Sequence, residues 1–137
     1  MKTSILFLWV FSLFFILSAC HHHALLSDRG GVDLELAPID RIELLILESF
    51  PVQVHVRITG YLPDSCTTFD HISQTRVENL FQVDVITKRP VDEVCAKLIT
   101  WFEETVALEV YGLPAGTYIV DVNGVRETFT LDVENRL

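Results

Sequence analysis

Positive charge is scarce in this chain. Ten Lys and Arg side chains stand against 19 Asp and Glu, and the formal net charge at pH 7 is −9. Nucleic acids and anionic lipid head groups attract basic surfaces, so we do not expect this acidic chain to bind either of them. The negative charge does not indicate which partner the chain does bind, because a net charge of either sign also keeps proteins soluble.

Catalytic motifs are also missing. The chain has no G-x-S-x-G, H-E-x-x-H or C-x-x-C sequence, and neither a P-loop nor a dinucleotide-binding glycine motif. These patterns place a nucleophile, a metal ligand or a phosphate cradle at the spacing that its chemistry needs. Their absence predicts a protein that is not an enzyme and that uses no cofactor, metal or small-molecule substrate.

One long apolar run is present, at the N-terminus. Residues Ile5–Leu17 follow Lys2 and are almost wholly apolar, which is typical of a secretory signal and too short for a membrane span of about 20 residues. The end of this run and the residues after it, Leu17-Ser18-Ala19-Cys20, resemble the lipobox of bacterial lipoproteins. The resemblance implies cleavage after a signal peptide at 1–19 and a lipid on Cys20 that tethers the exported chain to a bacterial membrane. A plain signal peptide and an uncleaved N-terminal helix are the alternatives.

Three cysteines occur in the chain. If Cys20 carries lipid, Cys66 and Cys95 remain as a pair, and pairs in exported chains usually form disulfides because their compartment is oxidising. We therefore predict a Cys66–Cys95 disulfide. The alternatives are two free thiols, or a nucleophilic cysteine with His55 or His71 as its base, for which no local signature is present.

Residues 20–37 show no sustained period and include Gly30-Gly31, so we expect a lipidated cysteine followed by a flexible tether. The His21–His23 run could bind a transition metal, but three adjacent side chains at a mobile position chelate poorly. A spacer is therefore the preferred interpretation of this run. Pro38 marks the expected start of the folded domain, residues 38–137.

The folded part alternates between apolar and polar residues with a period of two. Val52, Val54, Val56 and Ile58 follow this pattern, which predicts a half-buried strand. Seven strand-like runs separated by turns predict an all-β protein with two packed sheets. The runs lie at residues 39–48, 52–59, 69–77, 81–88, 106–110, 118–122 and 125–133.

Two local signals refine this prediction. Residues 90–99 change to helical spacing, and Pro90 suits a first helical position, so we expect one short crossover helix that carries Cys95. Asn123-Gly124 stands between two alternating runs. It predicts a type I′ hairpin, because both residues tolerate a positive φ.

The stretch Leu113–Val122 resembles the L-x-x-G-x-Y-x-V-x-V pattern of immunoglobulin-like domains. The resemblance implies an immunoglobulin-like sandwich in which Tyr118 forms a corner, with its ring in the core and its hydroxyl bonded back to the chain. Gly60–Cys66 and Arg89–Cys95 are also similar to stretches of small bacterial lipoproteins, but no activity follows from that similarity. A fold by itself carries no function.

Two pairs of side chains could offer oxygens to Ca²⁺. They are Asp121 with Asn123, and Asp64 with Asp70. Calcium needs six to eight oxygens in a compact loop, and the chain has no EF-hand spacing. We therefore predict no metal site.

The loop after the second predicted strand is the expected recognition surface. Tyr61, Leu62, Pro63 and Asp64 combine an aromatic, an aliphatic and a proline residue next to Cys66. The proline and the disulfide would restrict the loop, so it would lose less entropy on binding, and Tyr61 and Leu62 would supply an apolar anchor. The alternative is that these two side chains only close one end of the sandwich.

The sequence therefore predicts a lipid-anchored, extracytoplasmic binding or structural module of the bacterial cell envelope with a protein partner. The alternative is an inhibitor of an exported protease that presents the loop Gly60–Thr68. Trp101-Phe102 could form a second exposed patch, but such a pair is more often part of the core.

Overall fold

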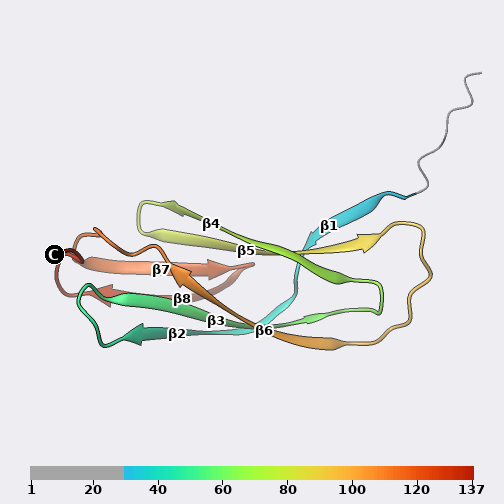
Figure 1. Cartoon of the computed structure of the whole chain (residues 1–137), viewed down its shortest axis with the longest axis horizontal. Coiled ribbons are helices and arrows are strands. Elements are labelled where there is room, and N and C mark those ends of the chain that lie inside the picture. The colour runs from blue at the N-terminus through green and yellow to red at the C-terminus, as the bar shows by residue number, and fades with distance from the viewer. Residues whose placement is uncertain (1–29) are drawn as a thin grey trace, which may run out of the picture.

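The computed structural model describes residues 30–137. The predicted signal peptide, Cys20 and the His21–His23 run lie outside the described residues. The described part folds into eight strands (Figure 1). It contains no helix with the length and hydrophobicity that a membrane span requires.

The eight strands form two sheets, which confirms the predicted all-β sandwich. One sheet has three strands in the order β2-β3-β6, and the other has five. The strands are β1 (Val32–Leu36), β2 (Ile39–Leu47), β3 (Gln53–Leu62), β4 (Thr68–Val77), β5 (Leu80–Pro90), β6 (Thr100–Leu108), β7 (Gly116–Val122) and β8 (Val125–Leu131).

β5 organises the larger sheet. One of its edges pairs with β4 along residues 80–88, and β4 is an edge strand. Two strands share the other edge of β5. β1 pairs antiparallel with residues 86–90, and β7 pairs parallel with residues 80–83. A hairpin then connects β7 to β8.

The core lies between the inward faces of the two sheets. Alternate residues of β3, β5 and β7 point inward, as the period of two predicts, and their side chains are almost inaccessible to solvent. Each such aliphatic side chain contributes about 1.5–3 kcal/mol relative to an exposed position. The fully buried valines and isoleucine are Val54, Val56, Ile58, Val83, Val85, Val120 and Val122.

Two local predictions are confirmed. The Tyr118 ring is buried, and its hydroxyl donates a 2.8 Å hydrogen bond to the carbonyl oxygen of Pro114. The centroid of the Tyr118 ring lies 5.4 Å from that of the Phe129 ring, which places the corner in the aromatic part of the core. Asn123 and Gly124 connect β7 and β8 with φ values of 47° and 93°, the positive values that the predicted turn requires.

The predicted helix at 90–99 is wrong. Residues 91–99 connect β5 to β6 without a helix. The disulfide at Cys95 and hydrogen bonds between Ala96 and Ser65 hold this segment against another loop instead. A helix of two turns is marginal in water and would need to bury its apolar face, but Val94 and Leu98 are exposed.

β1 lies in the segment that we expected to be a tether. The folded chain therefore begins near Val32 rather than at Pro38, and the number of strands is eight rather than about seven. Val32, Leu34 and Leu36 are between 53% and 61% exposed, so backbone pairing with β5 orders this strand without burying its side chains. Residues Val32–Leu36 do alternate between apolar and polar side chains, which is a strand signal that the tether interpretation left unused.

The end of the chain closes the sandwich opposite the 91–99 segment (Figure 1). Asn135 is 1% exposed, and its side-chain amide bonds to both backbone groups of Val52, with Val52 N to Oδ1 at 2.6 Å and Nδ2 to Val52 O at 2.9 Å. The same nitrogen donates to Val110 O at 3.0 Å. The last predicted run, 125–133, is two residues too long, because β8 ends at Leu131 and Val133 is 58% exposed.

Candidate binding surface

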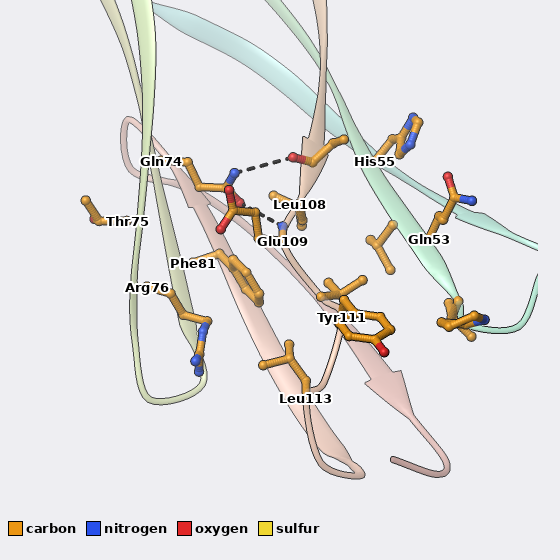
Figure 2. Close-up of a pocket in the computed structure, with 15 residues that line it drawn as sticks. Gln53, His55, Gln74, Thr75, Arg76, Phe81, Leu108, Glu109, Tyr111 and Leu113 are labelled. Atoms are coloured by element: carbon orange, nitrogen blue, oxygen red, sulfur yellow. Dashed lines mark hydrogen bonds between the residues drawn. The ribbon is translucent and has the colours of Figure 1, made fainter. Parts of the chain in front are cut away.

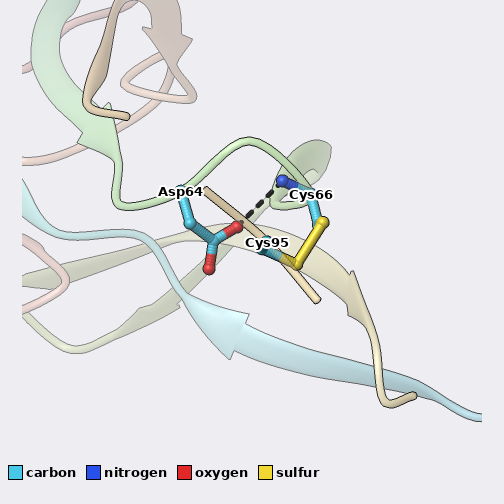
Figure 3. A group of neighbouring side chains, drawn as sticks. All are labelled: Asp64, Cys66 and Cys95. Carbon is cyan, nitrogen blue, oxygen red and sulfur yellow. Dashed lines mark hydrogen bonds between the residues drawn. A yellow bond between two sulfur atoms is a disulfide. The ribbon is translucent and has the colours of Figure 1, made fainter. Parts of the chain in front are cut away.

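Two loops meet at one end of the sandwich, which we call the disulfide end. The loop at 63–67 connects β3 to β4, and the loop at 91–99 connects β5 to β6. Cys66 and Cys95 join them, with their Cα atoms 5.6 Å apart (Figure 3). The predicted disulfide is confirmed. Figure 1 shows that β1, the first strand of the described chain, begins at this same end.

Asp64 organises the first loop. Its Oδ1 accepts hydrogen bonds from the backbone N–H groups of Cys66 at 2.9 Å and Thr67 at 2.8 Å, and from the Thr67 hydroxyl at 2.9 Å. Its Oδ2 accepts from Arg89 Nε at 2.9 Å. Desolvation opposes ionisation, but the hydrogen bonds from Thr67, Arg89 and Cys66 outweigh it and lower the pKa of Asp64 to about 2. The carboxylate therefore stays charged and holds the loop at neutral pH.

The second loop is attached to the first by two further contacts and to β5 by a third. Ser65 N donates to Ala96 O at 3.0 Å, and Ala96 N donates to Ser65 Oγ at 3.0 Å. Arg89 Nη2, from β5, lies 3.3 Å from Cys95 Sγ. No individual role for Ser65, Ala96 or Arg89 was predicted from the sequence. Ser65 lay within the predicted loop Gly60–Thr68, and Arg89 within a stretch similar to other lipoproteins, whereas Ala96 had no signal.

Asp64, Cys66 and Cys95 bring three ligand-type atoms within 4.8 Å of one another. The two sulfurs are bonded to each other, as Figure 3 shows, so the cluster offers no thiolate. The carboxylate oxygens already accept four hydrogen bonds. The arrangement therefore acts as a structural clamp on the two loops.

The four residues predicted to contact a partner differ in exposure. Pro63 is exposed, and Tyr61 and Leu62 are half-buried at the end of β3. The carboxylate of Asp64 is used in hydrogen bonds within the loop. The Tyr61 ring meets Trp101 edge to face, with centroids 5.5 Å apart and an interplanar angle of 62°. Tyr61, Leu62 and Pro63 therefore remain as the accessible part of the predicted recognition surface.

Trp101 and Phe102, expected together in the core, lie on opposite faces of β6. Phe102 packs against the core, whereas Trp101 is 59% exposed. Neighbouring strand residues point to opposite faces, so only one of them could be buried in this sheet. The Trp101 indole thus belongs to the surface of the disulfide end.

Gly60 permits the close approach of β3 to its neighbours at this end. A Cβ at this position would lie 2.5 Å from Cζ of Phe102 and 2.6 Å from the carbonyl oxygen of Pro38. Real side chains do not tolerate such distances. Any larger residue must displace both the Phe102 ring and the carbonyl group of Pro38 before β2.

A groove of about 710 Å³ lies at the opposite end of the sandwich (Figure 2). Phe81, at its base, is buried. Gln74 of β4 spans the two sheets there, because its Nε2 donates to Ala107 O and its Oε1 accepts from Glu109 N, both at 3.3 Å. His55 also lines this groove, but Figure 2 shows its imidazole directed away from the Glu109 carboxylate. The arrangement does not form a histidine–carboxylate pair.

The acidic residues considered for calcium have oxygens engaged within the protein. Asp121 accepts from Gly124 N at 2.7 Å and from Arg126 Nε at 2.6 Å. Asp70 accepts from His71 Nδ1 at 2.7 Å, and this bond is the largest cause of its lowered pKa. These carboxylates stabilise a turn and a strand edge.

The two-sheet architecture defines a β-sandwich protein. Residues 56–131 match the ORF11 beta-sandwich domain family, and the chain belongs to that family. The matched range begins inside β3 and ends with β8, so it contains the Cys66–Cys95 disulfide and the Tyr118 corner.

Two relatives from Herpetosiphon aurantiacus are similar to this chain. The "Uncharacterized 10.2 kDa protein in HgiCIIM 5'region" is 36% identical over 93 residues, which are 68% of this chain and 98% of the relative. The "Uncharacterized 10.2 kDa protein in HgiBIM 5'region" is 37% identical over 83 residues, which are 61% of this chain and 100% of the relative. Domain-sized sequences of this kind thus form almost the whole of those proteins. No solved structure matches this chain.

Proposed function

We propose that this chain is a lipid-anchored, extracytoplasmic binding or structural module of the bacterial cell envelope. The apolar leader and the Leu17–Cys20 lipobox support the anchor. With two or more acyl chains on Cys20, membrane attachment would be stable, because each buried methylene contributes about 0.8 kcal/mol and one chain alone is marginal. The sandwich would then act outside the cytoplasm as a tethered domain.

The observation that carries the binding role is the ordered loop at the disulfide end. Asp64, the disulfide and the Ser65–Ala96 contacts hold the loop in one conformation. A loop that is already ordered loses less entropy on binding. Tyr61, Leu62 and Pro63 supply the aromatic and aliphatic contact area for an envelope protein, while Asp64 acts as the positioning residue.

The same loop gives less support to the protease-inhibitor alternative. Recognition of an inhibitor loop as an added strand uses its free backbone groups. In this chain the N–H groups of Ser65, Cys66 and Thr67 are all occupied by internal hydrogen bonds. We therefore favour a binding module over an inhibitor.

Site-specific photo-crosslinking in a bacterial host tests the proposal. The full chain would carry a photoreactive amino acid at Pro63, and a matched control would carry it at Tyr111, which is 70% exposed near the opposite end. We expect a discrete protein adduct from position 63 and none from position 111. Equal labelling from both positions, or none from position 63, would contradict the loop as the contact site.

A further inference from the structure

The 91–99 loop exposes an unusual number of aliphatic side chains. Val94 is fully exposed, Leu98 and Ile99 are each 59% exposed, and Val91 is 47% exposed. Trp101 follows at the start of β6 and is 59% exposed. Single exposed apolar residues need no explanation, but a contiguous group of them marks a surface that another phase or molecule covers.

This loop is held in place at its start and in its middle. The disulfide at Cys95 and the hydrogen bonds of Ala96 fix its middle, and Val91 N donates to Gly31 O at 3.0 Å. The side chains of Val94 and Leu98 flank the fixed residues. The protein therefore presents these aliphatic groups on an ordered support.

The position of Gly31 indicates what lies near the loop. Gly31 accepts the Val91 hydrogen bond, and β1 begins at the same end of the sandwich (Figure 1). About ten residues separate Cys20 from Gly31 in the sequence, and their greatest reach is roughly 35 Å. A lipid on Cys20 would therefore keep the disulfide end within roughly 35 Å of the bilayer surface.

We infer that the 91–99 loop, with Trp101 beside it, contacts the lipid bilayer surface as a second membrane attachment. This inference rests on the proposed anchor at Cys20. Aliphatic side chains favour the boundary between head groups and acyl chains, and indoles favour the head-group level. The loop carries Asp92 and Glu93 against Lys97, so the attraction is apolar rather than electrostatic and does not require anionic lipid.

The test uses residues 24–137, which lack Cys20 and contain the whole sandwich. Relatives of domain size support the independence of this part. Trp101 is its only tryptophan, because the other one is Trp9, so its fluorescence reports on the disulfide end. Titration with phosphatidylcholine vesicles should shift the Trp101 emission to shorter wavelength, with little change between low and high salt.

The variants V94D and V94D/L98D should lower the vesicle partition coefficient by about tenfold or more. The matched control is V133D, at an exposed position beyond β8, and it should bind vesicles like the unsubstituted chain. Thermal melting checks that each variant is folded. Since Val94 is fully exposed, its substitution should leave the melting temperature within a few degrees.

Absence of vesicle binding, or equal binding by the V94D variant and the unsubstituted chain, would overturn the lipid contact. A loop that docks on a protein gives this same negative result with vesicles. The outcome is independent of the anchor, because the tested chain lacks Cys20. Mass spectrometry of the N-terminal peptide of the full chain separately decides whether Cys20 is lipidated.

Discussion

The side-chain amide of Asn123 takes the place of a strand residue beside Val85. Val85 N donates to Asn123 Oδ1 at 3.0 Å, and Asn123 Nδ2 donates to Val85 O at 3.0 Å. Asn123 Nδ2 also donates to Ala37 O at 2.8 Å. These bonds fill the gap on β5 between the last residue paired with β7 and the first paired with β1. One side chain thereby joins two strands that are distant in sequence.

Asn123→Gly should therefore destabilise the domain although it keeps the positive φ of the turn. Each unsatisfied backbone group near the core costs about 1–3 kcal/mol, so we expect a loss of about 2–4 kcal/mol in the free energy of unfolding. Urea denaturation measures it. Asn79→Ala is the control, since it removes one exposed bond to Thr117 O and should cost less than about 1 kcal/mol. Similar losses for both variants would disprove the bridging role.

Removal of the disulfide should also lower stability. Cys66 and Cys95 are 29 positions apart, and closure of such a loop stabilises the folded state by about 3–4 kcal/mol in the chain-entropy model. The Cys66→Ser/Cys95→Ser variant should lose that amount in urea denaturation. The disulfide-containing chain under reducing conditions should match the variant. Coincident unfolding curves with and without the bridge would contradict the prediction.

Asp64 should make the stability of the domain depend on acid pH. Its folded pKa is about 2, below its ordinary value of 3.8, so its contribution is fully present above about pH 4 and is lost as the pH falls through 2. Asp64→Asn should be less stable at pH 7 and should lose less stability between pH 5 and pH 2. Denaturation at a series of pH values checks both. Asp121 also has a lowered pKa, so some acid dependence should remain. An unchanged pH dependence in Asp64→Asn would speak against the clamp.

Gly60→Ala should destabilise through steric overlap. The new methyl group would meet the Phe102 ring and Pro38 O at 2.5 and 2.6 Å, and overpacking of this kind costs about 1–3 kcal/mol. Phe102→Leu in the same chain should recover part of the loss, because it removes one of the two obstacles. A double-mutant cycle measures this coupling. The prediction fails if the two substitutions are additive.

Cys20→Ala in the full chain should prevent both cleavage of the leader and attachment of lipid. Intact mass spectrometry of the membrane fraction would then show a chain that retains residues 1–19. The control is Cys66→Ser, which should still be processed and lipidated because it leaves the lipobox unchanged. An unmodified Cys20 at the N-terminus of the mature native protein would disprove the anchor.

Much of the sandwich could be predicted because the residue pattern of a single strand shows which of its two faces is buried. The alternation along Val54, Val56 and Ile58 depends only on which face each side chain occupies, and Asn123-Gly124 depends only on two φ angles. The Cys66–Cys95 bridge followed from the number of cysteines and the expected compartment. For the alternation and the turn, a short segment carries all the information that the prediction needs.

Other features depended on contacts between distant segments. The apolar spacing of 90–99 predicted a helix, but the bridge to Cys66 and the Ser65–Ala96 hydrogen bonds hold that segment as an irregular loop. β1 alternates between apolar and polar residues, but this short segment was interpreted as a tether, and only its pairing with β5 shows that it belongs to the larger sheet. No local pattern encodes either partner.

The sequence by itself therefore determined the face that each strand of the core buries, the corner at Tyr118 and the pair of cysteines that could join. Only the tertiary structure decided that β7 runs parallel to β5, that the Asn123 amide connects β7 to β1, and that the 91–99 loop lies beside Gly31. The physical reason is that side-chain alternation is a property of one strand, whereas pairing order is set by the closure of long loops around a shared core.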